Sequence, residues 1–392
     1  MKFIGKWEGY CTDRFQLAKL EQSVRDARKR PIIPTSTVVK ATYMMPVLGQ
    51  QSLLAVDQFN RQAGFRRFHK SPRKMVLSDT THERVLQTLN REDVLRMADT
   101  VVKKLDQEKL LTAKLPGGRT VSLGIIDGSQ FSALHSSVFV KAGSVDAVVD
   151  LEPYPGQGHE LHASRQLMQR VFKRHGREFV DVVVTDGLYP NQIDFRTCRE
   201  NGCHLLVKVK GSDNLSILKN SRRRFFFEDG SHRKDCSQQQ TGLDCLRGIK
   251  YEVTWAEKVI WNKLEYTAAC VKETDLKPSK KKPVHTEFWV ITTAEGFTGA
   301  DLREMAHRRW SIENQVFKRL NALVKSKIHK SHSKQVTEML LRLWFLGMTL
   351  LAAFLFERGL AWAQRAYKTV KITWLWITKQ MLISICSERS SP

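Results

Sequence analysis

Two Asp-Gly pairs and one glutamate are the residues of this chain whose types and spacing could do chemistry together. Asp127-Gly128 follows the largely apolar run 121–126, and Asp186-Gly187 follows the largely apolar run 179–185. Glu313 lies far beyond them in a segment with a helical pattern. Phosphodiester chemistry needs hard oxygen ligands that hold two Mg²⁺ ions about 3.5 to 4 Å apart, so that one activates the attacking oxygen and the other stabilises the leaving oxygen. Three carboxylates from separate elements are a candidate set of such ligands.

Each of these residues also has an ordinary structural explanation. An aspartate after a strand is typical of a turn, and this reading of Asp186 is the more common one when the residue is taken alone. Arg309 lies four residues before Glu313, so the two could form a simple ion pair on one helix, with Trp310 in the core. Other acids near the same segments are alternatives for the site: Asp146, Asp150, Asp194, and Asp181, which we expect at the entrance of its strand.

The elements that must position the aspartates read as an α/β core. Val182, Val183 and Val184, with Val180 before them, are apolar on both alternations, which is typical of a strand buried on both faces of a sheet, and ligands of open α/β sheets bind at the carboxyl ends of such strands. The run ending at Asp127-Gly128 is a second strand of this kind. Hydrophobic periodicity predicts further elements in this order: strands 131–140 and 145–151 in an antiparallel meander, helix 161–175, helix 190–200 and strand 203–210.

The glutamate is predicted on a long helix that follows a β insertion. Residues 211–283 are polar and basic, with period-two segments that indicate strands, and 287–293 is one more strand. Thr298 and Asp301 resemble a capping box, which predicts a helix over about 300–324. The core therefore spans 116–325, with the insertion at about 211–285.

The flanking regions, 1–115 and 326–392, are predicted to be helical. A basic cluster with two phenylalanines, 64–74, contains Arg66, Arg67 and Lys70 and precedes a short helical unit. This unit could bind DNA as a helix-turn-helix does, or the cluster could be a solvated loop between packed helices. The apolar run 343–356 has 14 residues. Because about 20 are needed to span a bilayer, we interpret it as a buried helix, and this C-terminal region could mediate dimerisation.

The net charge indicates the class of binding partner, and the cysteine content indicates the cellular compartment. The chain has a formal charge of +24 and a pI near 9.9, which favours a polyanionic partner, nucleic acid above all. Seven cysteines without regular spacing argue against a secreted disulfide framework and favour the cytoplasm. No membrane partner is expected, and no phosphate-binding Gly-x4-Gly-Lys-Ser/Thr loop is present. Two sets of residues are weak zinc candidates: Cys198, Cys203 and His204, and His232, Cys236 and Cys245.

The order of these features resembles the DDE transposases of bacterial insertion sequences. The resemblance covers about 118–325 and is carried by Asp127-Gly128, by Asp186-Gly187-Leu188-Tyr189, by the β insertion and by Arg309-Trp310-x-x-Glu313-Asn314. It implies an RNase H-like fold and a catalytic triad of Asp127, Asp186 and Glu313 that binds two Mg²⁺ ions, which Mn²⁺ can replace. It also implies nicking of transposon ends to free a 3′ hydroxyl, joining of that hydroxyl to target DNA, double-stranded DNA as partner and an active homodimer.

One branch of that family carries a Tyr-Arg-Glu-Lys signature on the glutamate helix, and this chain departs from it. Ala306 stands at the tyrosine position and Leu320 at the lysine position, with Lys318 and Arg319 as substitutes for the lysine. The predicted DNA-binding residues are Arg309, Trp310, Lys318, Arg319, Tyr189, Arg66, Arg67 and Lys70. Two alternatives stay open: a metal-dependent nuclease without a joining step, and a catalytically inactive DNA-binding protein derived from a transposase.

Overall fold

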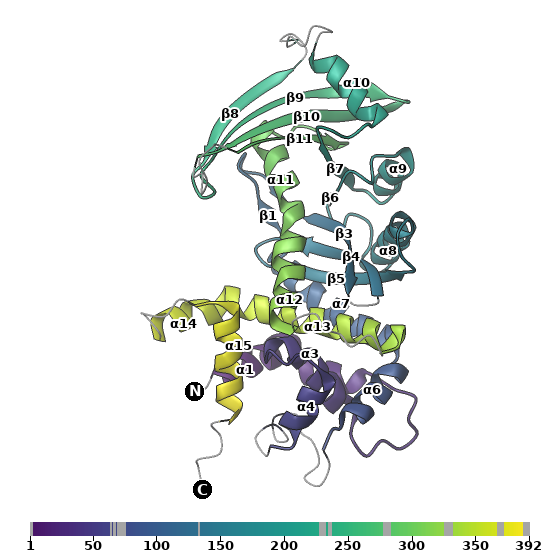
Figure 1. Cartoon of the computed structure of the whole chain (residues 1–392), viewed down its shortest axis with the longest axis vertical. Helices are drawn as coiled ribbons and strands as arrows, with labels where there is room; N and C mark the ends of the chain where they lie inside the picture. The colour runs from purple at the N-terminus through teal and green to yellow at the C-terminus, as the bar shows by residue number, and fades with distance from the viewer. Residues whose placement is uncertain are drawn as a thin grey trace.

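The chain folds around one nine-stranded mixed sheet with helices on both faces (Figure 1). This computed structural model describes residues 3–62, 65, 68, 76–131, 134–226, 233, 237–276, 284–324, 332–366 and 372–386. Strand order across the sheet is β5-β4-β3-β6-β7-β11-β10-β9-β8. The predicted α/β class with a mixed-sheet core is therefore confirmed.

Five strands form the core half of the sheet. They are β3 (Leu123–Phe131), β4 (Leu134–Ala142), β5 (Ala147–Tyr154), β6 (Val182–Thr185) and β7 (His204–Lys210). The first three form the predicted antiparallel meander, whereas β6 and β7 run parallel to β3. The crossovers are made by α8 (Glu160–His175) and α9 (Gln192–Glu200), close to the predicted ranges.

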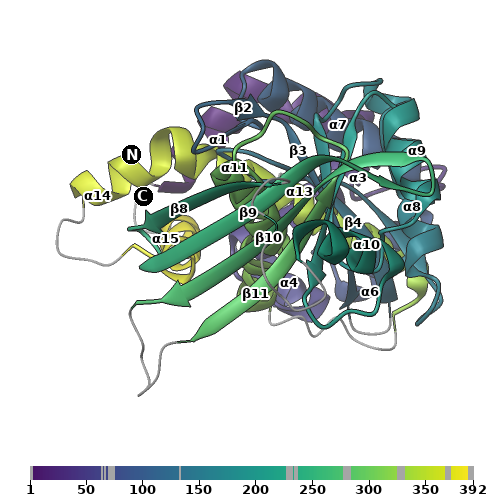
Figure 2. The same cartoon turned by 90° about the horizontal axis from the view of Figure 1, so that it is seen from above.

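The polar segment after β7 continues the same sheet. It contains α10 (Ser216–Phe225), β8 (Gln238–Asp244), β9 (Ile249–Trp261) and β10 (Leu264–Asp275), and it leads into β11 (His285–Thr292). Since β11 pairs antiparallel with both β7 and β10, the insertion strands are joined to the core by backbone hydrogen bonds. Figure 2 shows these strands side by side as a fan at one end of the molecule.

A single helical rod crosses one face of the sheet, opposite α8 and α9 (Figure 1). It begins with α11 (Gly299–Ser311), passes through the π-helical segment η2 (Ile312–Phe317) and continues as α12 (Lys318–Val324). The predicted capping box is present, because the Thr298 hydroxyl accepts from the Asp301 N–H and the Asp301 carboxylate accepts from the Thr298 N–H.

Helices from both ends of the chain form one layer at the other end of the molecule (Figure 1). Its tightest contact is between α3 and α13, where a Cβ added to Gly347 would lie 1.9 Å from the Tyr43 carbonyl oxygen, so only glycine fits there. The N-terminal helices are α1 (Phe3–Phe15), α2 (Leu17–Ser23), α3 (Thr35–Val47), α4 (Leu53–Asn60), α6 (Asp79–Thr88) and α7 (Arg91–Gln107). The C-terminal ones are α13 (Lys334–Phe354), η3 (Leu355–Gly359), α14 (Leu360–Ala366) and α15 (Trp374–Cys386).

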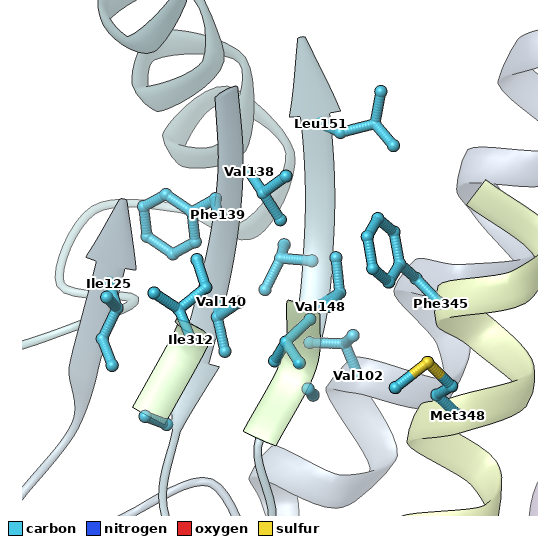
Figure 3. Packing of buried hydrophobic residues seen from close by; sticks show 14 of the residues in the cluster. Val102, Ile125, Val138, Phe139, Val140, Val148, Leu151, Ile312, Phe345 and Met348 are labelled. Atoms are coloured by element: carbon cyan, nitrogen blue, oxygen red, sulfur yellow. The ribbon is translucent and has the colours of Figure 1, made fainter. Parts of the chain in front are cut away.

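The apolar run that we interpreted as a buried helix is part of α13. The stretch Lys334–Arg365 is long and apolar enough to cross a membrane, but 89% of its most apolar window is buried inside the protein. Figure 3 shows Phe345 and Met348 of this helix facing Val148 and Leu151 of β5. This burial identifies α13 as a core helix that joins the helical layer to the sheet.

Two local expectations were wrong. The strand bearing Asp127 does not end there: β3 continues to Phe131, because its antiparallel pairing with β4 extends to Phe131 and Leu134. The N-terminal part also contains a short strand, β1 (Ala113–Lys114), which pairs with β2 (Thr120–Val121) across the predicted breaker segment. In both cases the strand exists because of a partner that sequence periodicity does not reveal.

A buried ion network fastens the sheet to its helices. The side chain of Asp150 on β5 is fully buried, accepts from Arg170 at 2.8 Å and from Arg342 of α13, and forms an ion pair with Arg174 at 3.0 Å. Burial by itself raises the pKa of Asp150, but the three guanidinium groups outweigh it and hold that pKa well below its usual value. Asp150 therefore carries a compensated charge that ties β5 to α8 and α13.

We expect Asp150→Asn to lower the free energy of unfolding by about 1 to 3 kcal/mol, because three guanidinium groups lose the buried carboxylate that they share, although each keeps one other acid, Glu152, Asp99 or Glu338. Chemical denaturation followed by far-UV circular dichroism measures this loss. Glu200→Gln is the matched control, since Glu200 pairs with Arg196 at 3.8 Å and both are mostly exposed. Its effect should stay within about 0.5 kcal/mol. Equal losses in the two variants would contradict the role assigned to Asp150.

Candidate active site

Strand register brings the two aspartates side by side. β3 and β6 pair in parallel with Ile125 opposite Val184. Continuing this register by two residues places Asp127 opposite Asp186, which directly follows β6. Because side chains two residues apart point to the same face and neighbouring strands lie about 4.8 Å apart, both carboxylates lie on the face of Ile125. This is the face that the helical rod crosses.

The environment of Asp127 disfavours its ionised form. Its side chain is 13% exposed, and burial raises its pKa to about 7. Arg309 opposes this shift, while the negative charges of Asp186, Glu313 and Glu160 add to it. The three predicted carboxylates are thus close enough to interact electrostatically, and a fourth acid, Glu160, belongs to the same group.

Arg309 connects two members of the triad. Its Nη2 lies 2.7 Å from Glu313 Oε1, and its Nη1 lies 3.2 Å from Asp127 Oδ2. The Arg309–Glu313 ion pair proposed as the structural explanation therefore exists, and the same guanidinium also reaches the core strand. Glu313 is 42% exposed, so its carboxylate remains accessible from solvent.

The local shape of the rod fixes where Glu313 lies. Glu313 belongs to η2, in which each backbone bond spans five residues, and such π segments in helices often occur at functional sites. Its neighbour Ile312 is fully buried and lies between Ile125 of β3 and Val140 of β4 in Figure 3. Packing of Ile312 thus anchors the glutamate beside the strand that carries Asp127.

The set of candidate ligand atoms is chemically suited to a hard divalent cation. It consists of carboxylate oxygens, and the negative charges of Asp186, Glu313 and Glu160 add to the effect of burial in raising the pKa of Asp127. Among the described residues, however, no three histidine, cysteine, aspartate or glutamate side chains converge closely enough to hold a metal ion. The Arg309 guanidinium lies between Asp127 and Glu313, and Asp186 Oδ1 accepts from the Leu188 N–H at 3.0 Å, the turn role considered for it above.

The predicted DNA-binding residues of the rod flank this site. Trp310 is 42% exposed. Lys318 is exposed and donates to Asn314 Oδ1 at 2.6 Å, and the Arg319 guanidinium lies 4.5 Å from the ring centroid of Trp374. A cavity of about 660 Å³ runs beside them between the rod and the C-terminal helices; it is lined in part by Trp310, Asn314, Arg319 and Trp374.

Other predicted residues lie elsewhere. Tyr189 is 1% exposed, and its hydroxyl contacts Ser164 at 2.8 Å and Glu160 at 3.4 Å inside the protein. Arg66, Arg67 and Lys70 lie outside the described residues. Of the zinc candidates, Cys198 and Cys203 are buried: the Cys203 thiol donates to the Cys198 carbonyl, and the Cys198 thiol contacts the Met168 sulfur. His232 and Cys236 are outside the described residues.

The alternative acids are explained by structural contacts. Asp194 pairs with Arg165 at 2.6 Å, and Asp150 belongs to the ion network described above. Asp181 accepts from the Ser122 N–H at 2.6 Å at the entrance of β6, where it was expected. Asp146 is half-buried, which raises its pKa, and it lines the cavity beside the rod.

Lys208 is a site residue that the sequence did not reveal. It lies on β7, and the parallel register, which pairs Val184 with Leu206, places it next to Asp186 in the row that begins at Asp127. Its Nζ lies 3.7 Å from the ring centroid of Trp310 and has no hydrogen-bond partner among the described residues. Burial, and next Arg309, lower its pKa to about 8. Only an alignment of the three predicted parallel strands could have identified Lys208 from the sequence.

Comparison with known proteins gives the family. The family model described as the transposase DDE domain matches residues 127–350, more than half of the chain, and its match begins at Asp127 and includes Asp186 and Glu313. No curated protein matches the chain.

Among solved structures, the chain is similar to a piggyBac transposase seen by cryo-EM in a synaptic complex with hairpin DNA. The identity is 9%, the TM-score is 0.40, and the match covers 100% of this chain and 82% of that one. The resemblance drawn from the sequence is confirmed at the level of the family, while the origin in a bacterial insertion sequence stays a prediction. On the match to its domain model, the chain belongs to the DDE transposases.

Proposed function

We propose that this transposase cleaves the phosphodiester bonds at transposon ends in a reaction that depends on divalent cations, and then transfers the freed 3′ hydroxyl into target DNA. The observation that supports this most is the gathering of Asp127, Asp186 and Glu313 at one edge of the sheet, with Arg309 bridging two of them. These are three acids from three separate elements, held in place by strand pairing and by the packing of one helix.

These carboxylates do not converge while Arg309 occupies oxygens of Asp127 and Glu313, so Asp127, Asp186 and Glu313 would hold two Mg²⁺ ions, or Mn²⁺ in their place, once that guanidinium has moved away. Such ions activate the attacking oxygen and stabilise the leaving oxygen of a phosphodiester. The protein contributes stiffness, since both aspartates are set by the β3–β6 register. Asp127, with a pKa of about 7, must give up its proton to act as a ligand.

The basic side chains around the carboxylates would bind the DNA backbone. Lys318 is exposed on the rod, and Arg319 lines the neighbouring cavity with Trp310. Lys208 lies in the same row as the aspartates, but its ammonium group is buried over the ring of Trp310, so we leave it out of the DNA-contacting surface. We leave Tyr189 out of this surface because it is buried.

The remaining features of the proposal concern the whole protein. The charge of +24 suits double-stranded DNA, both transposon ends and target. The cluster with Arg66, Arg67 and Lys70 stays a predicted DNA contact, the homodimer stays a proposal for the active complex, and we propose that the protein works in the bacterial cytoplasm.

We expect Asp127→Ala, Asp186→Ala and Glu313→Ala each to lower Mg²⁺-dependent cleavage of end DNA by more than about 100-fold, because losing a mere outer-shell partner of a metal site already costs about 10- to 100-fold. DNA binding should change only a few-fold. Gel assays of cleavage and of mobility measure the two properties. Asp181→Asn is the control, since Asp181 contacts the Ser122 N–H at the opposite end of β6. Full cleavage by any alanine variant would remove that residue from the site.

The same assay, scored for joined products, separates the alternatives. A transposase gives strand-transfer products from a pre-cleaved end, whereas a nuclease gives cleavage alone. A wild-type protein that binds DNA and neither cleaves nor joins it, with Mg²⁺ or with Mn²⁺, would be an inactive derivative.

We expect Arg309→Gln to increase the affinity of the DNA-free protein for Mn²⁺ by about 10-fold, because its guanidinium occupies carboxylate oxygens of Asp127 and Glu313 that a cation would use. Isothermal titration calorimetry measures the affinity. Arg308→Gln is the matched control on the adjacent position, since Arg308 contacts Glu304 and the Gly143 carbonyl instead. Unchanged or weaker Mn²⁺ binding by Arg309→Gln would show that the cation does not use these oxygens.

A further inference from the structure

Glu160, the first residue of α8, lies against the backbone next to Asp127. A Cβ added to Gly128 would lie 2.5 Å from Glu160 Cδ and 2.7 Å from both carboxylate oxygens, so the carboxylate fills the space that a side chain would need. The Gly128 N–H also donates to this carboxylate. Only glycine at position 128 therefore permits the contact between α8 and the strand that carries Asp127.

The same carboxylate also contacts the segment that carries Asp186. The Tyr189 hydroxyl donates to Glu160 Oε1 at 3.4 Å. Tyr189 is in turn bound to Asp186 through the backbone, since its N–H donates to the Asp186 carbonyl at 3.3 Å. Glu160 thus connects the two aspartate-bearing segments from the face opposite the helical rod.

A chain of hydroxyl groups fixes the direction of this contact. Tyr189 has one hydroxyl proton, which it gives to Glu160, so Ser164 must donate to the Tyr189 oxygen across their 2.8 Å separation. Ser137 of β4 then donates to Ser164 at 2.7 Å. This chain of hydroxyl groups from Ser137 ends at Glu160, whose carboxylate accepts the last hydrogen bond, from Tyr189.

The N-terminus of α8 is one ordinary stabilising feature for the charge of Glu160, which lies in the first turn of that helix. Within the described ranges, no lysine or arginine forms an ion pair with it, and its partners are the Gly128 N–H and the hydroxyls of Tyr154 and Tyr189. Glu160 is half-buried, and its negative charge is repelled by that of Asp186. A carboxylate that repels a neighbouring acid and still accepts hydrogen bonds from three donors is typical of a functional site.

We propose that Glu160 is a positioning residue of the transposase site, which fixes the spacing of Asp127 and Asp186 by accepting hydrogen bonds from Gly128 and Tyr189. This inference rests on the proposed function, because it assumes that the two aspartates act together. Neither the family match nor the triad pattern assigns a role to this residue. What it supplies is acceptor geometry, which an amide oxygen also provides.

The test compares Glu160→Ala with Glu160→Gln in the full-length protein. Glu160→Ala should lower cleavage by at least 10-fold and weaken Mn²⁺ binding in calorimetry, because the aspartates lose their common anchor. Glu160→Gln should stay within about 3-fold of the wild type in both measurements. Equal defects in the two variants would overturn the proposal in favour of a role for the charge, and wild-type behaviour of Glu160→Ala would overturn it as well.

A double-mutant cycle with Tyr189→Phe tests the proposed connection. If Glu160 acts through the Tyr189 hydroxyl, the combined loss in cleavage is smaller than the product of the two single losses. Independent losses that multiply would contradict the link. Thermal unfolding of each variant shows whether it is folded, and a fall in Mn²⁺ affinity without a fall in thermal stability excludes a merely structural role.

Asp127→Ala separates failure of this inference from failure of the proposed function. If Asp127→Ala cleaves DNA normally, the proposed site itself is wrong. If Asp127→Ala is inactive and Glu160→Ala is fully active, the site stands and only the role of Glu160 fails.

Discussion

The repulsion among acids at one edge of the sheet is the constraint on which the rest of this structure depends. Strand pairing forces Asp127 and Asp186 together, and the rod adds Glu313. Like charges at partly buried positions are costly: burial first, and then the negative charges of the neighbouring acids, raise the pKa of Asp127. Arg309 offsets part of it by pairing with two acids at once. The elements around the site must therefore hold the rod in place against this repulsion.

The insertion strands supply much of that hold. Glu273 on β10 accepts from His307 at 2.6 Å and from Arg303 at 2.5 Å, and all three side chains are buried. Buried charges of this kind stabilise one arrangement of α11 over others, because any shift would leave a charge without its partner. Farther along the rod, Ile312 packs into the core strands. The insertion thus works as an extension of the sheet that orients the glutamate helix.

A feature could be predicted from the sequence when it depends on residues that are close together along the chain. The core strands, the helices between them and the Thr298–Asp301 capping box follow from patterns within a few residues, and they were found. The Arg309–Glu313 pair also follows from helical spacing, but the reach of Arg309 to Asp127 depends on where the rod docks. Lys208 and Glu160 were missed for the same reason, since strand register and the docking of α8 bring them to the site.

The departures from the Tyr-Arg-Glu-Lys signature have a structural explanation in this chain. Ala306 and Leu320 are 0% and 1% exposed, so both positions face the interior. A tyrosine or lysine there would bury a polar group, which costs free energy unless a partner is at hand. Positive charge is instead available from exposed Lys318 on the rod and from Lys208 on β7, which contacts the ring of Trp310. Both signature positions therefore contribute to the packing of the rod in this chain, and the positive charge near the carboxylates comes from other residues.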